Sequence, residues 1–343
     1  MKIQITKIIA LLLLVFLFQT GGIAQRAESV ERVSITVSDL QKAVVFYTTL
    51  LDFKKTGEYT LSNDQVRQLF GLTDPSLQAT VAQLQLGAEK IELMAFVGNS
   101  TGRAIPADSR SNDRWFQHIA IVVNDMDKAY QRLRAAKVTY VSSSPQTLPD
   151  YIPAAAGIAA FYFRDPDGHN LELIHFPAGK GNPKWQQSNG PLFMGIDHTA
   201  IGIADTDQGL DFYKDDLQFQ IGGQSENYGT EQEHLNQVFG AHLLITGLHA
   251  DQGFGVEFLS YIAPPGGRPY PADSRPDDLW HWHTTVKVNG LAPLYEKLQT
   301  EGYTLVSNGI TNLSDRTKAF MARDSDGHAV LFLEDQPATN ADN

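Results

Sequence analysis

The same stretch of residues occurs twice in this sequence, and that repeat constrains the fold more than any other feature. Arg103–His118 reads RAIPADSRSNDRWFQH, and Arg268–His283 reads RPYPADSRPDDLWHWH, 165 residues further along the chain. A constant spacing across so many identical positions indicates a tandem duplication. Each copy ends in a histidine that opens a run of strand-like residues. The chain is therefore expected to carry a pair of similar sites.

The order of one strand, one amphipathic helix and several further strands is found four times along the chain. In the first unit, Val33–Val37 alternates apolar and polar residues, and Leu40–Leu51 places its apolar residues on one helical face. The turn Arg164–His169 supplies glycine where a tight hairpin needs it. The predicted fold class is α+β, with four βαβββ units at Val33–Phe96, His118–Phe176, Asp197–Tyr261 and His283–Glu334.

The N-terminal segment is expected to be a signal peptide. Lys2 and Lys7 precede the apolar run Ile8–Phe18, which is shorter than the roughly 20 residues that span a bilayer. Small residues at Gly22 and Ala24 favour cleavage after Ala24. An uncleaved membrane anchor is the alternative. The mature protein is then predicted to be periplasmic or secreted, with no membrane contact after cleavage.

Composition narrows the possible partners and chemistries. The formal net charge is −12 and no basic patch offsets it, so nucleic acid is not an expected partner. The absence of cysteine excludes thiolate chemistry and requires that any metal be held by nitrogen and oxygen atoms. The sequence also lacks a phosphate-binding loop and a dinucleotide-binding glycine fingerprint. A small-molecule substrate is the expected partner, whereas the oligomeric state is left open.

Five segments follow from the repeat and from the Gly/Pro-rich stretch Pro177–Pro191. We predict a signal peptide (1–24), a first domain (25–180), a linker (181–191), a second domain (192–336) and a polar tail (337–343). In this division the first two units form one domain and the last two form the other.

Four βαβββ units in this order resemble the vicinal oxygen chelate superfamily, which includes glyoxalase I, bleomycin-resistance proteins and extradiol dioxygenases. The resemblance covers about Val33 to Glu334. It implies that two units form a curved sheet around a divalent metal. The metal ligands would come from the first strand of a unit (His or Gln) and from its last strand (Glu).

The ligand positions follow independently from aligning the four units with one another. First-strand positions are Arg32, His118, His198 and His283, and last-strand positions are Glu92, Glu172, Glu257 and Leu331. A lone histidine at a strand start is most often a satisfied polar residue. A glutamate inside an apolar run is harder to explain without a partner, because an unpaired buried carboxylate is costly. We therefore predict metal binding in at least one domain.

Grouping these positions by domain gives two candidate sites. The first comprises Glu92, His118 and Glu172, and the second comprises His198, Glu257 and His283. The second is the preferred active site because Arg32 in the first domain would repel a cation and pair with Glu92 or Glu172. Two histidines and one carboxylate suit Fe(II), while Mn(II), Zn(II) and Ni(II) also fit nitrogen and oxygen ligands.

Other residues of the repeat have a structural and a functional interpretation. His281 is in phase with His283 and is the candidate acid–base catalyst. For Arg103 and Arg268, structural ion pairs with nearby aspartates are favoured over binding of an anionic substrate. For Trp280 and Trp282, packing is favoured over stacking on an aromatic ligand.

Two classes of function remain open. One is an exported, metal-dependent enzyme acting on a small oxygen-rich molecule by extradiol-type dioxygenation or by a lyase or isomerase step. The alternative is a non-catalytic binding or sequestration protein of the bleomycin-resistance type. Export argues against glyoxalase I itself, whose glutathione adduct is a cytoplasmic substrate.

The signal peptide gives the first testable prediction. The intact mass of the exported protein should correspond to a chain that begins at Gln25, because the short apolar run ends in small residues that signal peptidase accepts. A mature protein that retains residues 1–24 would contradict the assignment.

Overall fold

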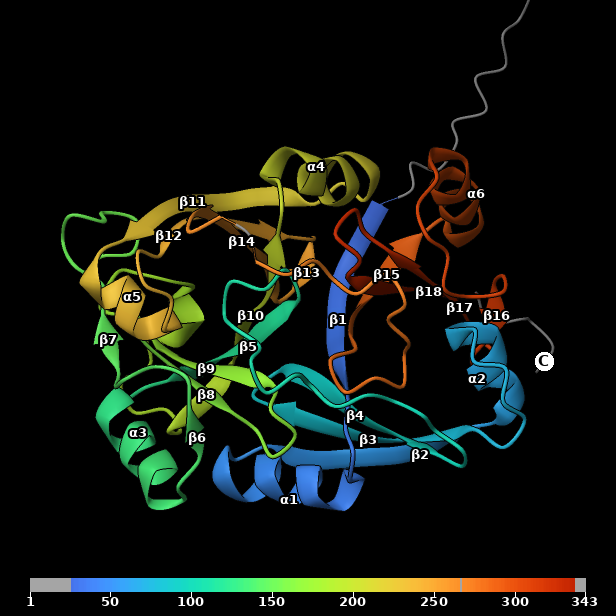
Figure 1. The fold of residues 1–343 in the computed structure, drawn as a ribbon, viewed down its shortest axis with the longest axis horizontal. Helices are drawn as coiled ribbons and strands as arrows, with labels where there is room; N and C mark the ends of the chain where they lie inside the picture. Colours follow the sequence, from blue (N-terminus) through green and yellow to red (C-terminus); the bar gives the residue numbers. More distant parts are fainter. Residues whose placement is uncertain (1–25, 266, 337–343) are drawn as a thin grey trace, which may run out of the picture.

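A computed structural model describes residues 26–265 and 267–336. Two strongly curved sheets of nine strands each lie side by side, as Figure 1 shows. The predicted signal peptide (1–24) and the predicted polar tail (337–343) lie outside the described residues. Within the described ranges, no helix combines the length and apolar character needed to cross a membrane.

The first sheet contains strands from both ends of the chain. Its order is β16-β17-β18-β15-β1-β4-β3-β2, with β13 paired to β1. The strands are β1 (Arg26–Thr36), β2 (Lys54–Leu61), β3 (Gln78–Leu86), β4 (Glu89–Val97), β13 (Gln252–Gly253), β15 (Trp282–Asn289), β16 (Thr311–Asn312), β17 (Thr317–Arg323) and β18 (Ala329–Asp335).

The second sheet is built from the middle of the chain. Its order is β11-β12-β14-β10-β5-β9-β8-β6, with β7 paired to β8. The strands are β5 (Phe116–Val123), β6 (Thr139–Tyr140), β7 (Gln146–Thr147), β8 (Ala159–Arg164), β9 (Asn170–His175), β10 (Phe193–Ile203), β11 (Gln220–Tyr228), β12 (His242–His249) and β14 (Gly255–Ala263).

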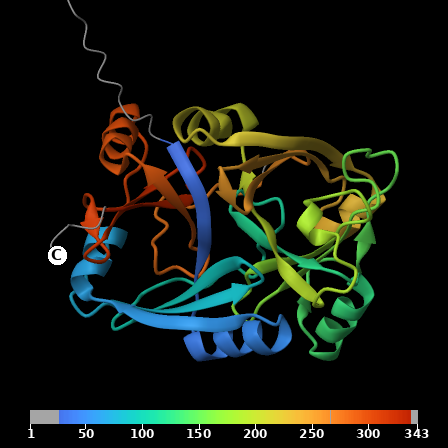
Figure 2. The same ribbon diagram turned by 180° about the vertical axis from the view of Figure 1, so that it is seen from behind.

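The helices lie around the two sheets, and α2 and α5 lie at opposite outer ends (Figure 2). They are α1 (Leu40–Leu50), α2 (Asn63–Phe70), α3 (Met126–Ala135), α4 (Thr206–Leu210), α5 (Thr230–Asn236) and α6 (Leu291–Glu301). The predicted helix Asp205–Leu217 is divided, because α4 continues as a π-helical turn over Asp211–Asp216. A short 3-10 helix spans Pro183–Trp185.

All four predicted units are present, but neither of the two predicted pairs of units shares a sheet. Unit 1 shares the first sheet with unit 4, and unit 2 shares the second sheet with unit 3. The prediction that units 1 and 2, and units 3 and 4, combine is therefore wrong. Residues 181–191, predicted as a domain linker, lie between β9 and β10 of one sheet. Apart from the two-residue strand β13, the chain changes sheet in the two repeated segments instead.

These repeated segments run between the sheets and are bound to each other reciprocally. Arg103 donates to both carboxylate oxygens of Asp278 (3.0 and 2.7 Å), and Arg268 donates to both of Asp113 (3.1 and 2.7 Å). The indole ring of Trp115 stacks on that of Trp280, 6.0 Å between centroids. The predicted ion pairs therefore exist, and each joins one copy of the repeat to the other.

Residue alternation along the first strands separates the core from the concave faces of the sheets. Val33 and Ile35 of β1, like Ile119 and Ile121 of β5, are fully buried in one apolar cluster that includes residues of all four units. The intervening residues, such as His118, face the concave side. Successive side chains of a strand point to opposite faces. A strand that places its apolar residues in the core therefore also places the intervening ligand positions on the concave face.

Four elements that close the concave faces were not predicted: β2, α2, β11 and α5. Nearly every residue of β2 and β11 is exposed, so these strands lack the alternation on which the prediction depends. The two helices are short, at eight and seven residues. They matter for function because both contribute to the walls of the cavities described below.

The reciprocal ion pairs give a stability prediction. Arg268→Met should lower the free energy of unfolding by about 2 kcal/mol, because the buried carboxylate of Asp113 loses two charged donors. The control is Arg67→Met, which breaks an exposed pair with Asp64 and should cost about 0.5 kcal/mol or less. Urea unfolding measures both, and equal losses would contradict a special role for the repeat.

Candidate metal centre

Four ligand-type side chains lie on the concave face of the second sheet, one from each of four adjacent strands. They are His118 on β5, Glu172 on β9, His198 on β10 and Glu257 on β14. Ala120 is opposite both Glu172 and His198, and Ala200 is opposite both His118 and Glu257. Because these two alanines fill little space, the four longer side chains converge over them.

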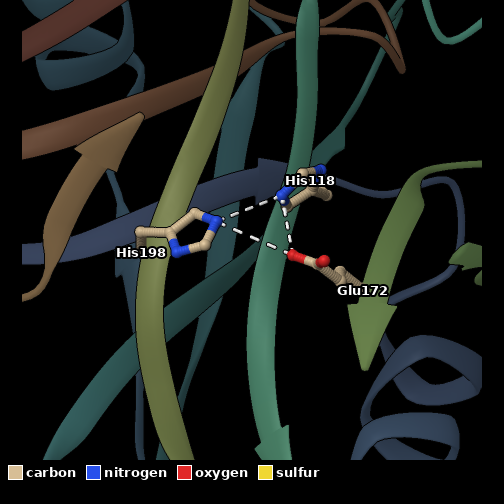
Figure 3. Close-up of side chains that lie close together, drawn as sticks. All are labelled: His118, Glu172 and His198. Carbon is tan, nitrogen blue, oxygen red and sulfur yellow. Dashed lines mark hydrogen bonds and ion pairs between the residues drawn. The ribbon is translucent and has the colours of Figure 1, made fainter. Parts of the chain in front are cut away.

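The distances between the polar atoms define a compact cluster (Figure 3). His118 Nε2 lies 3.0 Å from Glu172 Oε2 and 3.3 Å from His198 Nε2. His198 Nε2 lies 3.6 Å from Glu172 Oε2 and 3.3 Å from Glu257 Oε2. Both imidazoles therefore direct Nε2 toward the carboxylates.

The opposite ring nitrogens are held by neighbouring residues. His198 Nδ1 donates to Asp197 Oδ2 (3.0 Å), and His118 Nδ1 contacts Gln117 Oε1. Asp197 also accepts from the indole N–H of Trp185. A proton fixed at Nδ1 leaves the Nε2 lone pair free for a metal ion, as is usual for histidine ligands.

Electrostatics at this cluster favour a positive charge. Burial alone would lower the pKa of His198, but the carboxylates of Glu257 and Asp197 outweigh it and raise this pKa well above its ordinary value. Burial alone would raise the pKa of Glu257, but the charges of His198 and His118 hold it below its ordinary value. The carboxylates thus stabilise a cation among them.

The donor set fits a divalent ion. Glu172 Oε2 is buried and accepts no hydrogen bond within the described chain, although it faces two imidazole nitrogens. A metal ion would satisfy this oxygen and both Nε2 atoms at once. Two imidazoles and two carboxylates suit Fe(II), Mn(II), Zn(II) or Ni(II), so the arrangement does not choose among them.

A cavity of about 280 Å³ opens beside the cluster and is lined by both Glu172 and Glu257. One wall is rich in amide and hydroxyl groups contributed by β11 and α5. The polar residues of this wall are Gln224, Ser225, Asn227 and Gln232. Tyr162 and Ile174 also line the cavity, together with several apolar side chains. The cavity therefore suits a small molecule with several hydroxyl or carbonyl groups.

The equivalent positions of the first sheet do not form a metal site. Arg32 Nε lies 2.9 Å from Glu92 Oε2, as expected for a guanidinium at a ligand position. Leu331 supplies no ligand atom. His283 lies opposite Ser34 on β1, in the other sheet from His198. Among the described residues, only the second sheet brings three ligand-type side chains within metal-binding distance of one another.

The two predicted ligand sets are therefore wrong as groups, although the individual positions face the concave surfaces. His118 and Glu172 from the first half of the chain meet His198 and Glu257 from the second half. Preference for the second domain as the active site is wrong for the same reason. Glu92 and His283 belong to the other sheet, because the chain crosses between sheets at each repeat.

His281 does not reach the metal cluster. It is fully buried next to β15 in the first sheet, with its ring 5.6 Å from that of His283. Burial, together with the nearby His283 and Arg323, lowers the pKa of His281 well below its ordinary value. The structure does not support the predicted acid–base role for this residue.

Several residues that shape the site were not found from the sequence. Asp197 could have been suspected, because it precedes His198 and a strand irregularity between Ile196 and His198 lets both side chains interact. Gln117 and Trp185 carry no recognisable signal. The polar wall was missed together with β11 and α5.

Comparison with known protein sequences gives two findings. The family model of the Glyoxalase/Bleomycin resistance protein/Dioxygenase superfamily matches residues 29–173 and 195–332. A 2-epi-5-epi-valiolone epimerase from Actinomyces sp is 35% identical over 181 residues, which are 51% of this chain and 93% of that protein.

Two solved structures share the fold at low identity. Glyoxalase I from Zea mays has a TM-score of 0.57 at 15% identity, over 90% of this chain and 93% of that chain. A putative dioxygenase from Bacillus subtilis has a TM-score of 0.54 at 15% identity, over 91% of this chain and 86% of that chain.

Metal content tests the regrouped site. His118→Ala and His198→Ala should each lose bound metal, because each removes one of two imidazole ligands. His283→Ala is the matched control and should keep the full metal content of the wild type. Elemental analysis of protein purified without a chelator makes the measurement. Loss of metal in His283→Ala would contradict the assignment.

Proposed function

The chain belongs to the Glyoxalase/Bleomycin resistance protein/Dioxygenase superfamily, and we propose that it is a metal-dependent epimerase or isomerase. The reaction would move a proton on a carbon next to a carbonyl group of a small, polyhydroxylated molecule. The observation that carries this proposal is the convergence of two imidazoles and two carboxylates beside one cavity.

In this proposal His118, His198 and Glu172 hold the metal ion, with Glu257 at its edge. A bound divalent ion would polarise the substrate carbonyl and so make the neighbouring C–H bond more acidic. The side chains of Glu172 and His118 are 5% and 1% exposed, which suits them to a fixed, ligating role.

Glu257 is the better placed of the two glutamates to exchange a proton with substrate. Its side chain is 23% exposed to the cavity, and its carboxylate contacts only one of the two imidazoles, that of His198. A cation held beside this carboxylate favours its ionised form, which can accept a proton. Delivery of a proton from water to the opposite face of the same carbon gives epimerisation. Return of the proton to the carbonyl carbon, with transfer of the neighbouring hydroxyl proton to the carbonyl oxygen, gives isomerisation.

The substrate class follows from the cavity wall and from one relative. Gln224 and Ser225 each donate one hydrogen bond within the chain, to Thr246 and Asn227, and keep oxygen atoms that can accept from substrate hydroxyls. The Actinomyces relative is named as an epimerase of 2-epi-5-epi-valiolone. We therefore propose a small hydroxyketone of similar size, and export of the protein through its N-terminal segment.

Dioxygenation is the second candidate, and a specific observation favours it. His118, His198 and Glu172 form the set of two histidines and one carboxylate that suits non-haem Fe(II). The fourth group, Glu257, favours proton transfer over dioxygenation because a base is then present beside the substrate. Consumption of dissolved oxygen separates the two reactions.

Solvent exchange provides the direct test. Metal-loaded protein in D₂O should incorporate deuterium into 2-epi-5-epi-valiolone at the carbon next to its carbonyl, detected by NMR. Glu257→Gln should slow this exchange by about 100-fold or more, the usual effect of removing a general base. The matched control, Glu226→Gln, changes an exposed glutamate of β11 outside the cavity and should exchange at the wild-type rate.

Other outcomes would reject the proposal in favour of a different class. Oxygen consumption without deuterium exchange, tested with catechols, would favour the dioxygenase. Tight binding of the hydroxyketone with neither reaction would favour a sequestration protein.

A further inference from the structure

The first sheet encloses a larger cavity than the metal cluster does, and neither the proposed reaction nor the metal uses it. Its volume is about 530 Å³, against about 280 Å³ beside the metal cluster. It is lined by residues of the first sheet and of α2, and Figure 1 shows α2 beside this sheet at the outer end of the molecule. The side chains at its floor occupy the positions equivalent to the metal ligands.

The carboxylate of Glu92 lies at the floor of the cavity, and both of its oxygen atoms already have hydrogen-bond donors. Glu92 Oε2 accepts from Ser34 (2.9 Å) and faces Arg32 Nε (2.9 Å). Glu92 Oε1 accepts from Tyr59 (3.1 Å) and from Gln83 (3.2 Å). Burial alone would raise the pKa of Glu92, but Arg32 and Gln83 hold it below its ordinary value. Glu92 is therefore ionised and needs neither a metal nor a ligand.

Arg32 retains unused donors at this floor. Glu92 faces its Nε, and neither terminal nitrogen of the guanidinium makes a hydrogen bond within residues 26–265 and 267–336. Nearby, His283 is 2% exposed, and its Nδ1 has no hydrogen-bond partner in the same residues. His283 lines the cavity with other atoms, because its Nδ1 is buried, so Arg32 is the group that offers free donors to a ligand.

The remaining walls are apolar, and the charges at the rim limit what can enter. Phe70, Met94 and Leu331 are each at most 3% exposed and line the cavity. Glu31 and Asp335 lie among its charged lining residues, and Lys287 is paired with Asp335 (2.8 Å). A ligand with several negative charges would meet repulsion from these carboxylates, whereas a single carboxylate can reach the free edge of Arg32.

We propose that this cavity is a metal-free binding site for a small organic monocarboxylate with an apolar or aromatic body. The ligand carboxylate accepts from the terminal nitrogens of Arg32, whose planar donors match a carboxylate in geometry. Its apolar body lies against Phe70, Met94 and Leu331. The site is independent of the metal centre, because the two lie in different sheets and share no lining residue.

Calorimetry with the metal-loaded full-length mature protein tests this site. The probes are trans-cinnamate, benzoate and octanoate, with cinnamamide as the uncharged match of cinnamate. At least one carboxylate should bind with a stoichiometry of one per chain, and cinnamamide should bind at least tenfold more weakly than cinnamate if cinnamate is the one that binds. Failure of all three carboxylates to bind would overturn the proposal.

Three variants localise the binding. Arg32→Lys keeps the charge but removes the planar donors, and it should weaken carboxylate binding about tenfold or more. Leu331→Glu places a second carboxylate on the floor and should abolish binding while the metal content stays at the wild-type level. His198→Ala should lose the metal and still bind the carboxylate.

The reverse pattern would contradict the site. Binding that disappears in His198→Ala would place the ligand at the metal centre. Binding that is unchanged in both Arg32→Lys and Leu331→Glu would exclude the cavity of the first sheet. Failure of the proposed epimerase reaction would leave these outcomes unaffected, because none of them depends on turnover.

Discussion

The antiparallel pairing of β5 with β10 is the interaction on which the rest of the structure depends. It places His118 opposite Ala200 and His198 opposite Ala120, so two histidines from different halves of the chain meet over two small residues. The parallel partners β9 and β14 then add Glu172 and Glu257. A shift of one residue would turn each of these side chains to the opposite face of the sheet, so this register determines whether the site exists.

The two sheets satisfy the same electrostatic requirement in different ways. A carboxylate buried on a concave face needs a positive partner, because an unpaired buried charge is strongly destabilising. In the second sheet the protonated His198 or a metal ion can meet this need. In the first sheet Arg32 meets it permanently, and Leu331 removes the remaining ligand. Arg32 and Leu331, the two departures from the ligand pattern, therefore both lie in the first sheet. All four ligand positions of the second sheet keep a histidine or a glutamate.

The sequence was sufficient to locate the units, the core and the individual ligand positions. Strand alternation around Val33 or His118 is a local property, and the duplication aligns equivalent positions in all four units. The sequence did not show which units share a sheet, because that pairing depends on contacts such as the ion pair of Arg103 with Asp278, which joins residues far apart in the chain. The cavity walls were also missed, since the exposed strand β11 has no buried face to produce a pattern.

The central claim is that each chain has one metal centre, formed by units 2 and 3. The equivalent positions of units 1 and 4 hold an ion pair instead. Anomalous X-ray diffraction from crystals grown with excess Mn(II) tests it most directly. The account predicts one strong peak per chain, at about 2.0–2.4 Å from His118, His198 and at least one of Glu172 and Glu257. A peak beside Glu92 and His283, or no peak at the second sheet, would contradict it.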